Sequence, residues 1–597
     1  MTTQKQTAAQ SKPMPKAPST LERWFPIAVW LPKYEWGKYL TLDLIAAISV
    51  AALLIPESMG YASVAGVPVQ IGLYAAPLAL IFYALFGGSK LLVFAAAGST
   101  AAVSASVVGS LAAGDKDTAV LMTAALAITS GLVFIVAGLA KMGWISNFIS
   151  KAVMAGFIAG MSIQIIVGQF GKLVGVKVAD GNTFEKLWSA ISQIGSWNWS
   201  AAIMGIGALL LILAISRFIP KLPAALTAVV VASVIVAVIN PDIDLVAQIP
   251  QGLPSFGLPT GIEAPDWLTL LAGGAVVALV GFSEGWGASG NLSKKTHDQL
   301  DTNQEFRAYG LGNIGAGLLG GMVVTGSLSK SSAAMSAGAK TQMSNILMAL
   351  FVLLTLAFLA PLFQWLPETV LAAIVINVML ESANPEKIIR FRRIDKVAFA
   401  LSLITFLLVL LFDLLPAMIV GIILSVSFMV FRVSFPGRVV LGRVEETGDY
   451  EAMSWMYGRR HGKIQSEAHS VPGVIIYRFD APLIFANAEA FKNTGKALLI
   501  QAGAEGKLPH TVVIDFEEVF YVDDTGATAL TDFFDYIQRY GVDLKLARVH
   551  SGAHELLRLA GVMEEIGEGR IYNTVRKAVD AATSSTTAQS AEKPTSS

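Results

Sequence analysis

Residues 321–342 read GMVVTGSLSKSSAAMSAGAKTQ, and an earlier segment, residues 94–106, reads FAAAGSTAAVSAS. In each segment a short apolar run of extended character reaches a Gly-Ser pair, which starts at Gly98 in one and at Gly326 in the other, and small or hydroxyl side chains follow. This composition predicts a short helix whose N-terminus begins inside a membrane. The free N–H groups and the dipole of such a helix start attract an anion. Two helix starts that face each other would hold one negative solute.

A repeat of the whole hydrophobic unit relates these two segments. The sequence YLTL at Tyr39 heads an apolar segment that ends near Glu57, and WLTL at Trp267 heads another that ends near Glu284. The YLTL and WLTL motifs are 228 residues apart, as are the two Gly-Ser pairs, and the two glutamates are 227 apart. In membrane carriers, interrupted helices at matching places in two repeats indicate a substrate site near the middle of the bilayer.

The composition is that of a polytopic membrane protein. Of 597 residues, 54% are hydrophobic and only 14% are charged, and the formal net charge is zero, which gives no electrostatic reason to expect a nucleic-acid partner. The chain has no cysteine, which excludes disulfides, thiolate nucleophiles and cysteine-ligated metals. No GxxxxGK[ST] loop supports transport driven by ATP. We expect no cofactor, no metal and no enzyme activity.

Division of the chain at Pro, Gly and charged residues predicts fourteen membrane-spanning segments, because a spanning helix needs roughly 20 apolar residues. Seven lie in a first repeat, about 39–240, and seven in a second, about 267–431. An odd number per repeat makes the two repeats inverted in the membrane. Lys and Arg gather in the loops that this topology places inside, above all in the cluster 387–396. We therefore expect a multi-pass protein of the plasma (inner) membrane with both termini in the cytoplasm.

Shifts in composition predict the remaining domain boundaries. Residues 1–20 are too polar to pack and are expected to form a disordered tail, followed by a transmembrane transport domain over 21–431. The charged and mixed stretch 432–471 is interpreted as a linker. Residues 472–583 alternate strand-like and helix-like runs, which predicts a soluble α/β domain. Residues 584–597, rich in Ser, Thr and Ala, are expected to be a second disordered tail.

Four segments of the chain resemble the SulP sulfate permease family. They are IPESMGY at Ile55, VQIGLYAA at Val69 with GGSK at Gly87, GSLSKS at Gly326 with AGAKTQ at Ala337, and DDTG at Asp523, the last in a region similar to a STAS domain. The resemblance covers residues from about 40 to 583. It implies a uracil-permease-like architecture, in which a core domain of helices 1–4 and 8–11 moves against a gate domain of the others, and it implies a homodimer.

The resemblance also implies a substrate site between the N-termini of the third and tenth helices. The residues expected to bind the anion are Glu57, Gly98, Ser99, Thr100, Glu284, Gly326, Ser327, Leu328, Ser329 and Lys330. The hydroxyls among them would donate to the anion; the alternative is that they satisfy only local backbone. Lys330 would hold the anion or pair with Glu284, unless it extends to water.

The two glutamates are also candidates for carrying a coupling ion. Glu284 matches the carboxylate that this family places near its substrate, and Glu57 is its equivalent in the first repeat, where many relatives have Gln. An ionised carboxylate is costly in lipid, which favours a protonatable role, whereas a carboxylate at the cytoplasmic end of a helix would simply be hydrated. Glu57 is either a second titrating group or a hydrogen-bonding substitute for Gln.

One candidate regulatory residue lies in the STAS-like domain. Thr525 corresponds to the place where anti-sigma-factor antagonists carry a phosphorylated Ser, at the start of a helix, where the dipole favours a phosphate. The alternative is that this domain serves only packing and contacts with a cytoplasmic protein partner.

Together these observations predict a secondary-active transporter of small inorganic anions, with sulfate as the first candidate, protons as the coupling ion and an elevator-like motion. Sulfate is suggested by the resemblance and not by the spacing. Some sodium-coupled bicarbonate relatives carry Thr at places that here are Ala288 and Leu328, which weakens a sodium site. A sodium-coupled bicarbonate or dicarboxylate transporter, an anion exchanger and a channel stay open as alternatives. So does a regulatory or scaffold protein with a vestigial membrane part.

Overall fold

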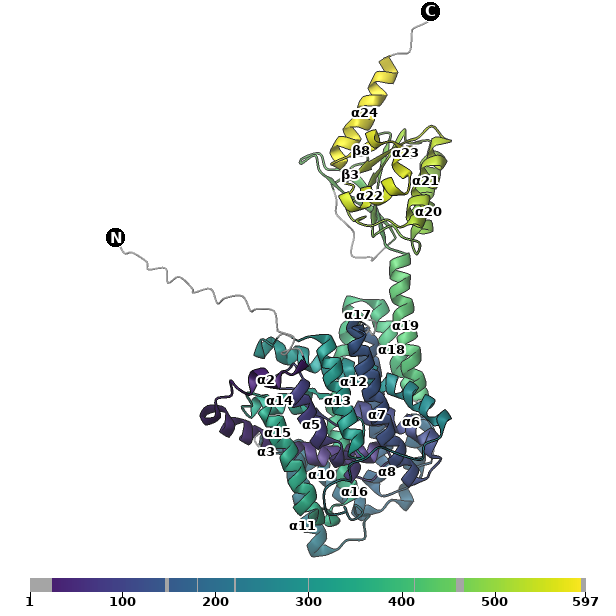
Figure 1. Cartoon of the computed structure of the whole chain (residues 1–597). Helices are drawn as coiled ribbons and strands as arrows, with labels where there is room; N and C mark the ends of the chain where they lie inside the picture. Colours follow the sequence, from purple (N-terminus) through teal and green to yellow (C-terminus); the bar gives the residue numbers. More distant parts are fainter. Residues whose placement is uncertain are drawn as a thin grey trace, which may run out of the picture. The chain divides into compact units, whose positions relative to one another are not determined.

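The computed structural model describes residues 24–144, 150–179, 181–219, 222–298, 300–412, 414–457 and 467–591. These residues form two compact units, one up to Ser425 and one from Val426 (Figure 1). We call them the helical unit and the C-terminal unit. The tail expected over residues 1–20 lies outside the described residues.

The first half of the helical unit contains nearly all of its structure in helices, with one short strand between them. Its elements are α2 (Ile27–Trp30), α3 (Trp36–Val64), α4 (Gln70–Tyr74), α5 (Ala76–Phe86), β1 (Val93–Ala95), α6 (Gly98–Ala112), α7 (Lys116–Leu139), α8 (Lys151–Val174), α9 (Thr183–Ser192), α10 (Trp199–Phe218) and α11 (Ala224–Ile239).

The second half repeats this order of long helix, strand and short helix. Its elements are α12 (Ala264–Thr296), α13 (Thr302–Leu318), β2 (Thr325–Ser327), α14 (Leu328–Ser336), α15 (Met343–Leu354), α16 (Glu368–Ser382), α17 (Pro385–Ile394), α18 (Lys396–Leu411) and α19 (Leu414–Ser434), whose last residues belong to the C-terminal unit.

The two halves interleave. Helix α7 packs against α12 and α13, and α15, which holds the matching place in the second half, packs against α3 and α5. In the same way α6 packs against α12, and α14 packs against α3. Such an exchange of partners is what two repeats of opposite orientation produce. The predicted polytopic helical fold is confirmed.

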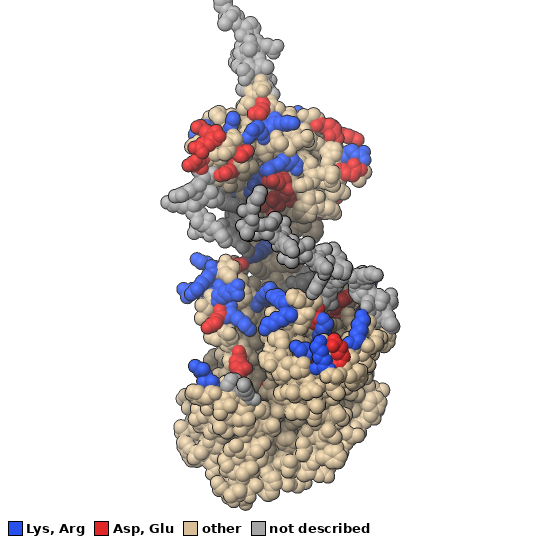
Figure 2. All heavy atoms as spheres, turned by 90° about the vertical axis from the view of Figure 1, so that its left-hand side faces the viewer, with Lys and Arg blue, Asp and Glu red and all other residues tan. Residues whose placement is uncertain are grey.

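The surface of the helical unit suits a lipid bilayer. Among the described residues, seven helices are long and apolar enough to cross a membrane, and four shorter helices are also apolar. On the face that Figure 2 shows, charged side chains gather at one end of this unit and the remainder carries almost none. Helix α17 concentrates exposed cations, at Lys387, Arg390, Arg392 and Arg393. Exposed charge is costly in hydrocarbon, which explains why the remainder of this face carries so little of it.

Two helices are longer than the sequence indicates. The segment expected to end near Glu57 continues through Pro56 to Val64, and the one expected to end near Glu284 continues to Thr296. Residues 56–62 are all buried, so packing stabilises a helix that the missing N–H of proline would otherwise interrupt. Both glutamates therefore lie within helices, and the expectation of helix ends there is wrong.

The C-terminal unit is a six-stranded sheet covered by helices on both faces. The strand order is β4 (Tyr450–Tyr457), β3 (Gly437–Arg443), β5 (Val474–Asp480), β6 (Thr511–Asp515), β7 (Asp543–Ala547) and β8 (Ile571–Tyr572). The strands β5 to β8 are parallel. One face packs on α20 (Ala488–Ala504), α21 (Asp524–Gln538), α22 (Ser551–Leu559) and α23 (Val562–Ile566), and the other on α24 (Val575–Ala591).

Two expectations for this unit are corrected by the structure. The stretch 432–471, expected to be a linker, contains β3 and β4, which extend the sheet in antiparallel pairing. The tail expected to be disordered from residue 584 is helical up to Ala591 as the end of α24. In β3, Val439 and Leu441 are buried, but so are Arg438 and Gly442, so the strand has no strict alternation that the sequence could reveal.

Close helix packing in the helical unit depends on glycine. A side chain at Gly156 in α8 would meet the backbone oxygen of Ser402 in α18 at 2.0 Å, whereas a side chain at Gly168 on the same helix would meet nothing within 4 Å. We expect Gly156→Ala to destabilise the purified protein by about 1–3 kcal/mol through overpacking. Gly168→Ala is the matched control and should change stability by no more than about 1 kcal/mol, in the stabilising direction. Thermal unfolding in detergent measures both, and equal melting temperatures for the two variants would contradict this packing.

Candidate functional site

Two short strands meet inside the helical unit and bring two helix starts together. Strand β1 pairs with β2 in antiparallel register, with Val93 opposite Ser327 and Ala95 opposite Thr325. Helix α6 begins three residues after β1, and α14 begins directly after β2. The predicted convergence of the segments that contain Gly98 and Gly326 is therefore present in the structure.

Side-chain amides and the hydroxyl of Ser331, which accepts from the N–H of Val93 at 2.8 Å, satisfy the backbone around the strands. Asn313 of α13 accepts a hydrogen bond from the N–H of Val324 at 2.9 Å and donates to its carbonyl at 3.0 Å. The carbonyl of Leu92 accepts from Gln342 at 3.1 Å and from Asn345 at 2.8 Å. These bonds are needed because non-helical backbone at membrane depth must find its partners within the protein.

Lys330 forms a buried ion pair with Glu57. The ammonium lies 2.6 Å from Oε2 of Glu57, and the two side chains are 1% and 3% exposed. The same ammonium donates to the carbonyl of Ala96 at 3.4 Å and lies 5.0 Å from the ring centre of Tyr61. Lys330 therefore does not extend to water, and the expected pairing with Glu284 is wrong. Helix α3 runs past Glu57 for two more turns, which brings that carboxylate to the first turn of α14.

Glu284 contacts the start of the other short helix. Its carboxylate accepts a short hydrogen bond from the hydroxyl of Ser99, in the first turn of α6. Glu284 is half-buried in the middle of α12, far from either end of that helix, so the interpretation as a hydrated carboxylate at a helix end does not hold. Each predicted carboxylate thus lies at one of the two short helices.

The other predicted residues surround these contacts. Gly98 and Gly326 allow close approach, since a side chain at Gly98 would meet Met379 at 2.5 Å and one at Gly326 would meet the hydroxyl of Tyr309 at 2.8 Å. The Thr100 hydroxyl donates to the carbonyl of Ala97, so it satisfies local backbone.

The start of α14 combines a buried cap with an exposed turn. The hydroxyl of Ser327 accepts from the N–H of Lys330 at 3.4 Å and lies 3.2 Å from the hydroxyl of Ser329. Leu328 and Ser329 are exposed. Their exposure leaves room beside the first turn of the helix.

Three residues near the site were not predicted. Tyr61 lies under the ammonium of Lys330, and Met379 of α16 contacts Gly98. Glu381, also on α16, is close enough to Glu57 to interact with it electrostatically. In the sequence, Tyr61 follows Glu57 by one helical turn, which is a usable signal. Met379 and Glu381 carry no local signal, because only the tertiary packing of α16 brings them close.

The candidate regulatory residue lies where a phosphate would be accessible. Thr525 is exposed in the first turn of α21, and Asp523 caps that helix by accepting from the N–H of Gly526 at 2.8 Å. The capping carboxylate already satisfies one free N–H group there. The role of Thr525 stays a prediction.

The buried ion pair between Glu57 and Lys330 predicts how substitution of either residue changes the stability of the protein. Lys330→Met leaves Glu57 buried without its partner, and breaking such a pair costs about 3–5 kcal/mol. We expect a lower melting temperature for this variant and recovery in Glu57→Gln/Lys330→Met, which buries no charge. Lys340→Met, which changes an exposed lysine near the end of the same segment, is the control. Equal stability of Lys330→Met and Lys340→Met would show that no buried ion pair exists.

Comparison with known proteins identifies the family. Residues 40–405 match the sulfate permease family and residues 465–578 match the STAS domain. The chain is 31% identical over 561 residues to a probable sulfate transporter of Mycobacterium tuberculosis, covering 94% of this chain and 98% of that protein. It is 28% identical to the chloroplastic sulfate transporter 4.1 of Arabidopsis thaliana, over 94% of this chain and 82% of that protein.

Solved structures share the fold. The murine Solute Carrier 26 family member A9 anion transporter in the inward-facing state matches 96% of this chain and 97% of its own, with a TM-score of 0.85 and 22% identity. The transmembrane domain of a cyanobacterium bicarbonate transporter matches 65% of this chain and 97% of its own, with a TM-score of 0.57 and 23% identity. From the family match and the relatives together, this chain belongs to the sulfate permease family and carries a STAS domain in its C-terminal unit.

Proposed function

We propose that this protein is a secondary-active transporter of small inorganic anions, with sulfate as its first substrate, protons as its coupling ion and an elevator-like motion. The observation that carries the proposal is the meeting of two helix starts beside a buried lysine, with a carboxylate on each. The names of the sulfate transporters to which the chain is similar support sulfate. We also propose that the protein lies in the plasma membrane, that both of its termini are in the cytoplasm and that it forms a homodimer.

The ion pair between Glu57 and Lys330 suggests how a proton and an anion are coupled. Lys330 is the cation that an oxyanion would seek, but Glu57 already neutralises it at 2.6 Å. Bringing a second negative charge to this buried place is unfavourable while Glu57 is ionised. A proton on Glu57 removes that charge and leaves Lys330 free to bind the anion. Proton and anion then enter the site together.

Glu284 acts in the same sense on the other short helix. Its carboxylate holds the hydroxyl of Ser99, a group that would otherwise donate to the anion at the start of α6. Protonation of Glu284, or its rotation away, would release this donor. Both glutamates therefore occupy in advance the places that suit a negative solute.

The packing supports a moving core. The contacts of the site come almost wholly from α3, α6, α12 and α14, which pack on one another. Met379 and Glu381 belong instead to α16, which packs mainly on α8 and α10 and meets α3 where the two groups touch. Movement of the first group against the second would carry the anion across while its main contacts stay intact.

A sodium-coupled transporter of bicarbonate or a dicarboxylate would use the same helix starts. The two positions where some relatives supply threonine, Ala288 and Leu328, offer no side-chain oxygen for sodium here. Protons are therefore the better-supported coupling ion. The scaffold alternative requires a vestigial membrane part, whereas the buried ion pair in that part is costly to retain without a use.

Uptake of labelled sulfate by proteoliposomes tests the proposal. We expect saturable uptake that an inward proton gradient accelerates and an inward sodium gradient does not. Bicarbonate and succinate serve as competitors, and chloride loaded inside tests exchange. Saturable uptake of bicarbonate driven by sodium, without uptake of sulfate, would contradict the proposal. A scaffold would give no saturable flux of any of these anions, and a channel would give current without coupled proton movement.

The coupling scheme predicts how pH affects sulfate binding. If one proton enters with each anion, the dissociation constant for sulfate should rise by up to about tenfold per pH unit once Glu57 is ionised. Glu57→Gln mimics the protonated acid, so binding at neutral pH should tighten and its pH dependence should decrease. Glu57→Gln/Glu284→Gln should abolish the dependence. Equilibrium binding of labelled sulfate, followed from about pH 5 to about pH 9, measures this effect. Glu263→Gln, at an exposed carboxylate, is the control, and an unaltered slope in Glu57→Gln would exclude Glu57 as the proton carrier.

A further inference from the structure

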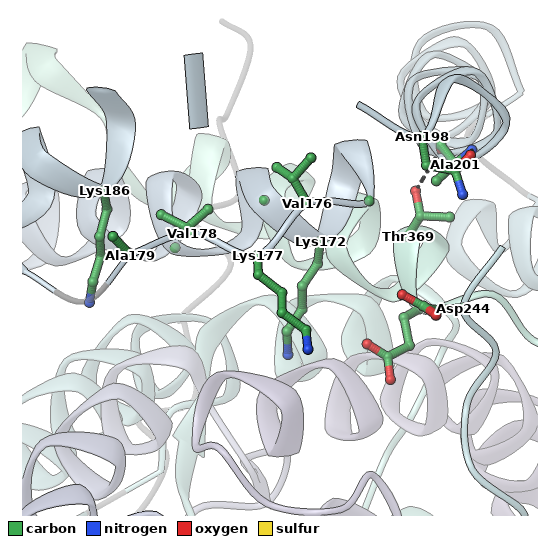
Figure 3. A pocket seen from close by; sticks show the side chains of 14 residues that line it. Lys172, Val176, Lys177, Val178, Ala179, Lys186, Asn198, Ala201, Asp244 and Thr369 are labelled. Carbon is green, nitrogen blue, oxygen red and sulfur yellow. Dashed lines mark hydrogen bonds between the residues drawn. The ribbon is translucent and has the colours of Figure 1, made fainter. Parts of the chain in front are cut away.

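A cavity lies away from the paired helix starts. It has a volume of about 610 Å³ and is lined by the end of α8, the chain that follows it, and the starts of α10 and α16 (Figure 3). Helix α16 begins in this cavity at Glu368 and ends at Ser382, directly before the cationic helix α17. The cavity is therefore at the end of the helical unit opposite to α17. In the proposed topology this end faces away from the cytoplasm.

Three lysines line the cavity. Lys172, Lys177 and Lys186 contribute to its wall together with Asp244 and Glu368, so that the lining carries one more positive than negative charge. In Figure 3, Lys186 and Asp244 lie at opposite ends of the view, and the ammonium groups of Lys172 and Lys177 extend in the same direction between them. No ion pair within 4.0 Å joins any of the three lysines to a carboxylate among the residues that the structure describes.

Lys172 links this cavity to the helix that carries Glu57. Its ammonium donates to the hydroxyl of Ser63 at 2.6 Å and lies 3.5 Å from the carbonyl of the same residue. Ser63 is in the last turn of α3, where the helix dipole favours a cation. Glu57 precedes it by six residues, which corresponds to about 9 Å along the helix. An anion that replaced Ser63 as the partner of Lys172 would lie on the way to Lys330.

We infer that this cavity is a second oxyanion site, in which Lys172 and Lys177 bind a small tetrahedral oxyanion before it reaches the paired helix starts. Lysines are disfavoured on the non-cytoplasmic side, so three of them around one cavity need a function. The hydrogen-bond partner of Lys172 is neutral, and among the described residues no carboxylate forms an ion pair with the three lysines, so their positive charge is available to an anion. The inference rests on the proposed function for the identity of the anion, but the site itself does not depend on transport.

A phospholipid is a second possible source of the same chemistry. Helix α9, which carries Lys186, exposes an apolar stripe at helical spacing, formed by Phe184, Leu187, Trp188 and Ile191. Such a helix between two spanning helices lies at the membrane surface. A lipid phosphate could therefore approach the cavity from its side, and the experiment must separate it from a free anion.

Amine footprinting of the purified full-length protein in detergent tests the site. Acetylation of each lysine is followed by mass spectrometry while sulfate is added at constant ionic strength, with Lys116, exposed at the start of α7, as the internal reference. We expect sulfate to slow the acetylation of Lys172 and Lys177 relative to Lys116. In Lys172→Gln, which can still bond to Ser63, half-protection of Lys177 should require about fivefold more sulfate. Asp244→Asn removes a repelling charge and should lower that concentration.

Two further measurements distinguish the cavity site from the site at the paired helix starts. In Glu57→Gln/Lys330→Met, protection of Lys172 should persist, even if that variant no longer binds sulfate at the helix starts. Loss of the protection of Lys172 in this double variant would overturn the inference. Protection of Lys116 equal to that of Lys172 would overturn it as well. Micelles that contain phosphatidylglycerol replace sulfate in a parallel arm. Protection by the lipid and not by sulfate assigns the site to a lipid phosphate, protection by sulfate assigns it to a free oxyanion, and protection by neither overturns it.

Discussion

The structure of the helical unit depends on satisfying backbone hydrogen bonds where no water is available. Two segments of the chain cross its interior without being helical, and each would leave N–H and C=O groups unpaired. They solve the problem together, because β1 and β2 pair with one another. The side chains of Asn313, Gln342 and Asn345 bond to the backbone just beyond the pair. Helices α6 and α14 start where these strands end, so the same bonds fix both helix starts.

The charges of the site follow from this arrangement. A helix start and a buried ammonium are positive features, and in lipid each needs a negative partner. Glu57 supplies one for Lys330, and Glu284 occupies the start of α6 through Ser99. The site is thus neutralised by its own side chains. In the proposed function a solute anion would compete with them, so its binding would depend on the protonation of the two carboxylates.

Contacts near both ends of α3 hold the site in position. Asp43, buried near the start of α3, accepts from the backbone N–H groups of Lys340 and Thr341 at 2.7 and 3.2 Å, just after α14. Near its other end, α3 is held through Ser63 by Lys172 of α8. The first contact joins elements that carry the site, and the second joins α3 to a helix outside that group. Of these two contacts, only the hydrogen bond between Lys172 and Ser63 would have to break if α3, α6, α12 and α14 moved against α8, α10 and α16.

The sequence by itself determined the membrane class, the repeat, the helix start at Gly98, a second helix start just after Gly326 and the α/β character of the C-terminal unit, because composition and spacing are local properties of the chain. The partner of Lys330 was decided by tertiary structure. Glu57 and Glu284 are equivalent in the repeat and both lie within continuous helices, and it is the packing of α3 on α14 that brings Glu57 to that ammonium. The strands within 432–471 were likewise decided by the folded sheet, because β3 gains its place by pairing with β5, and the edge strand β4 by pairing with β3.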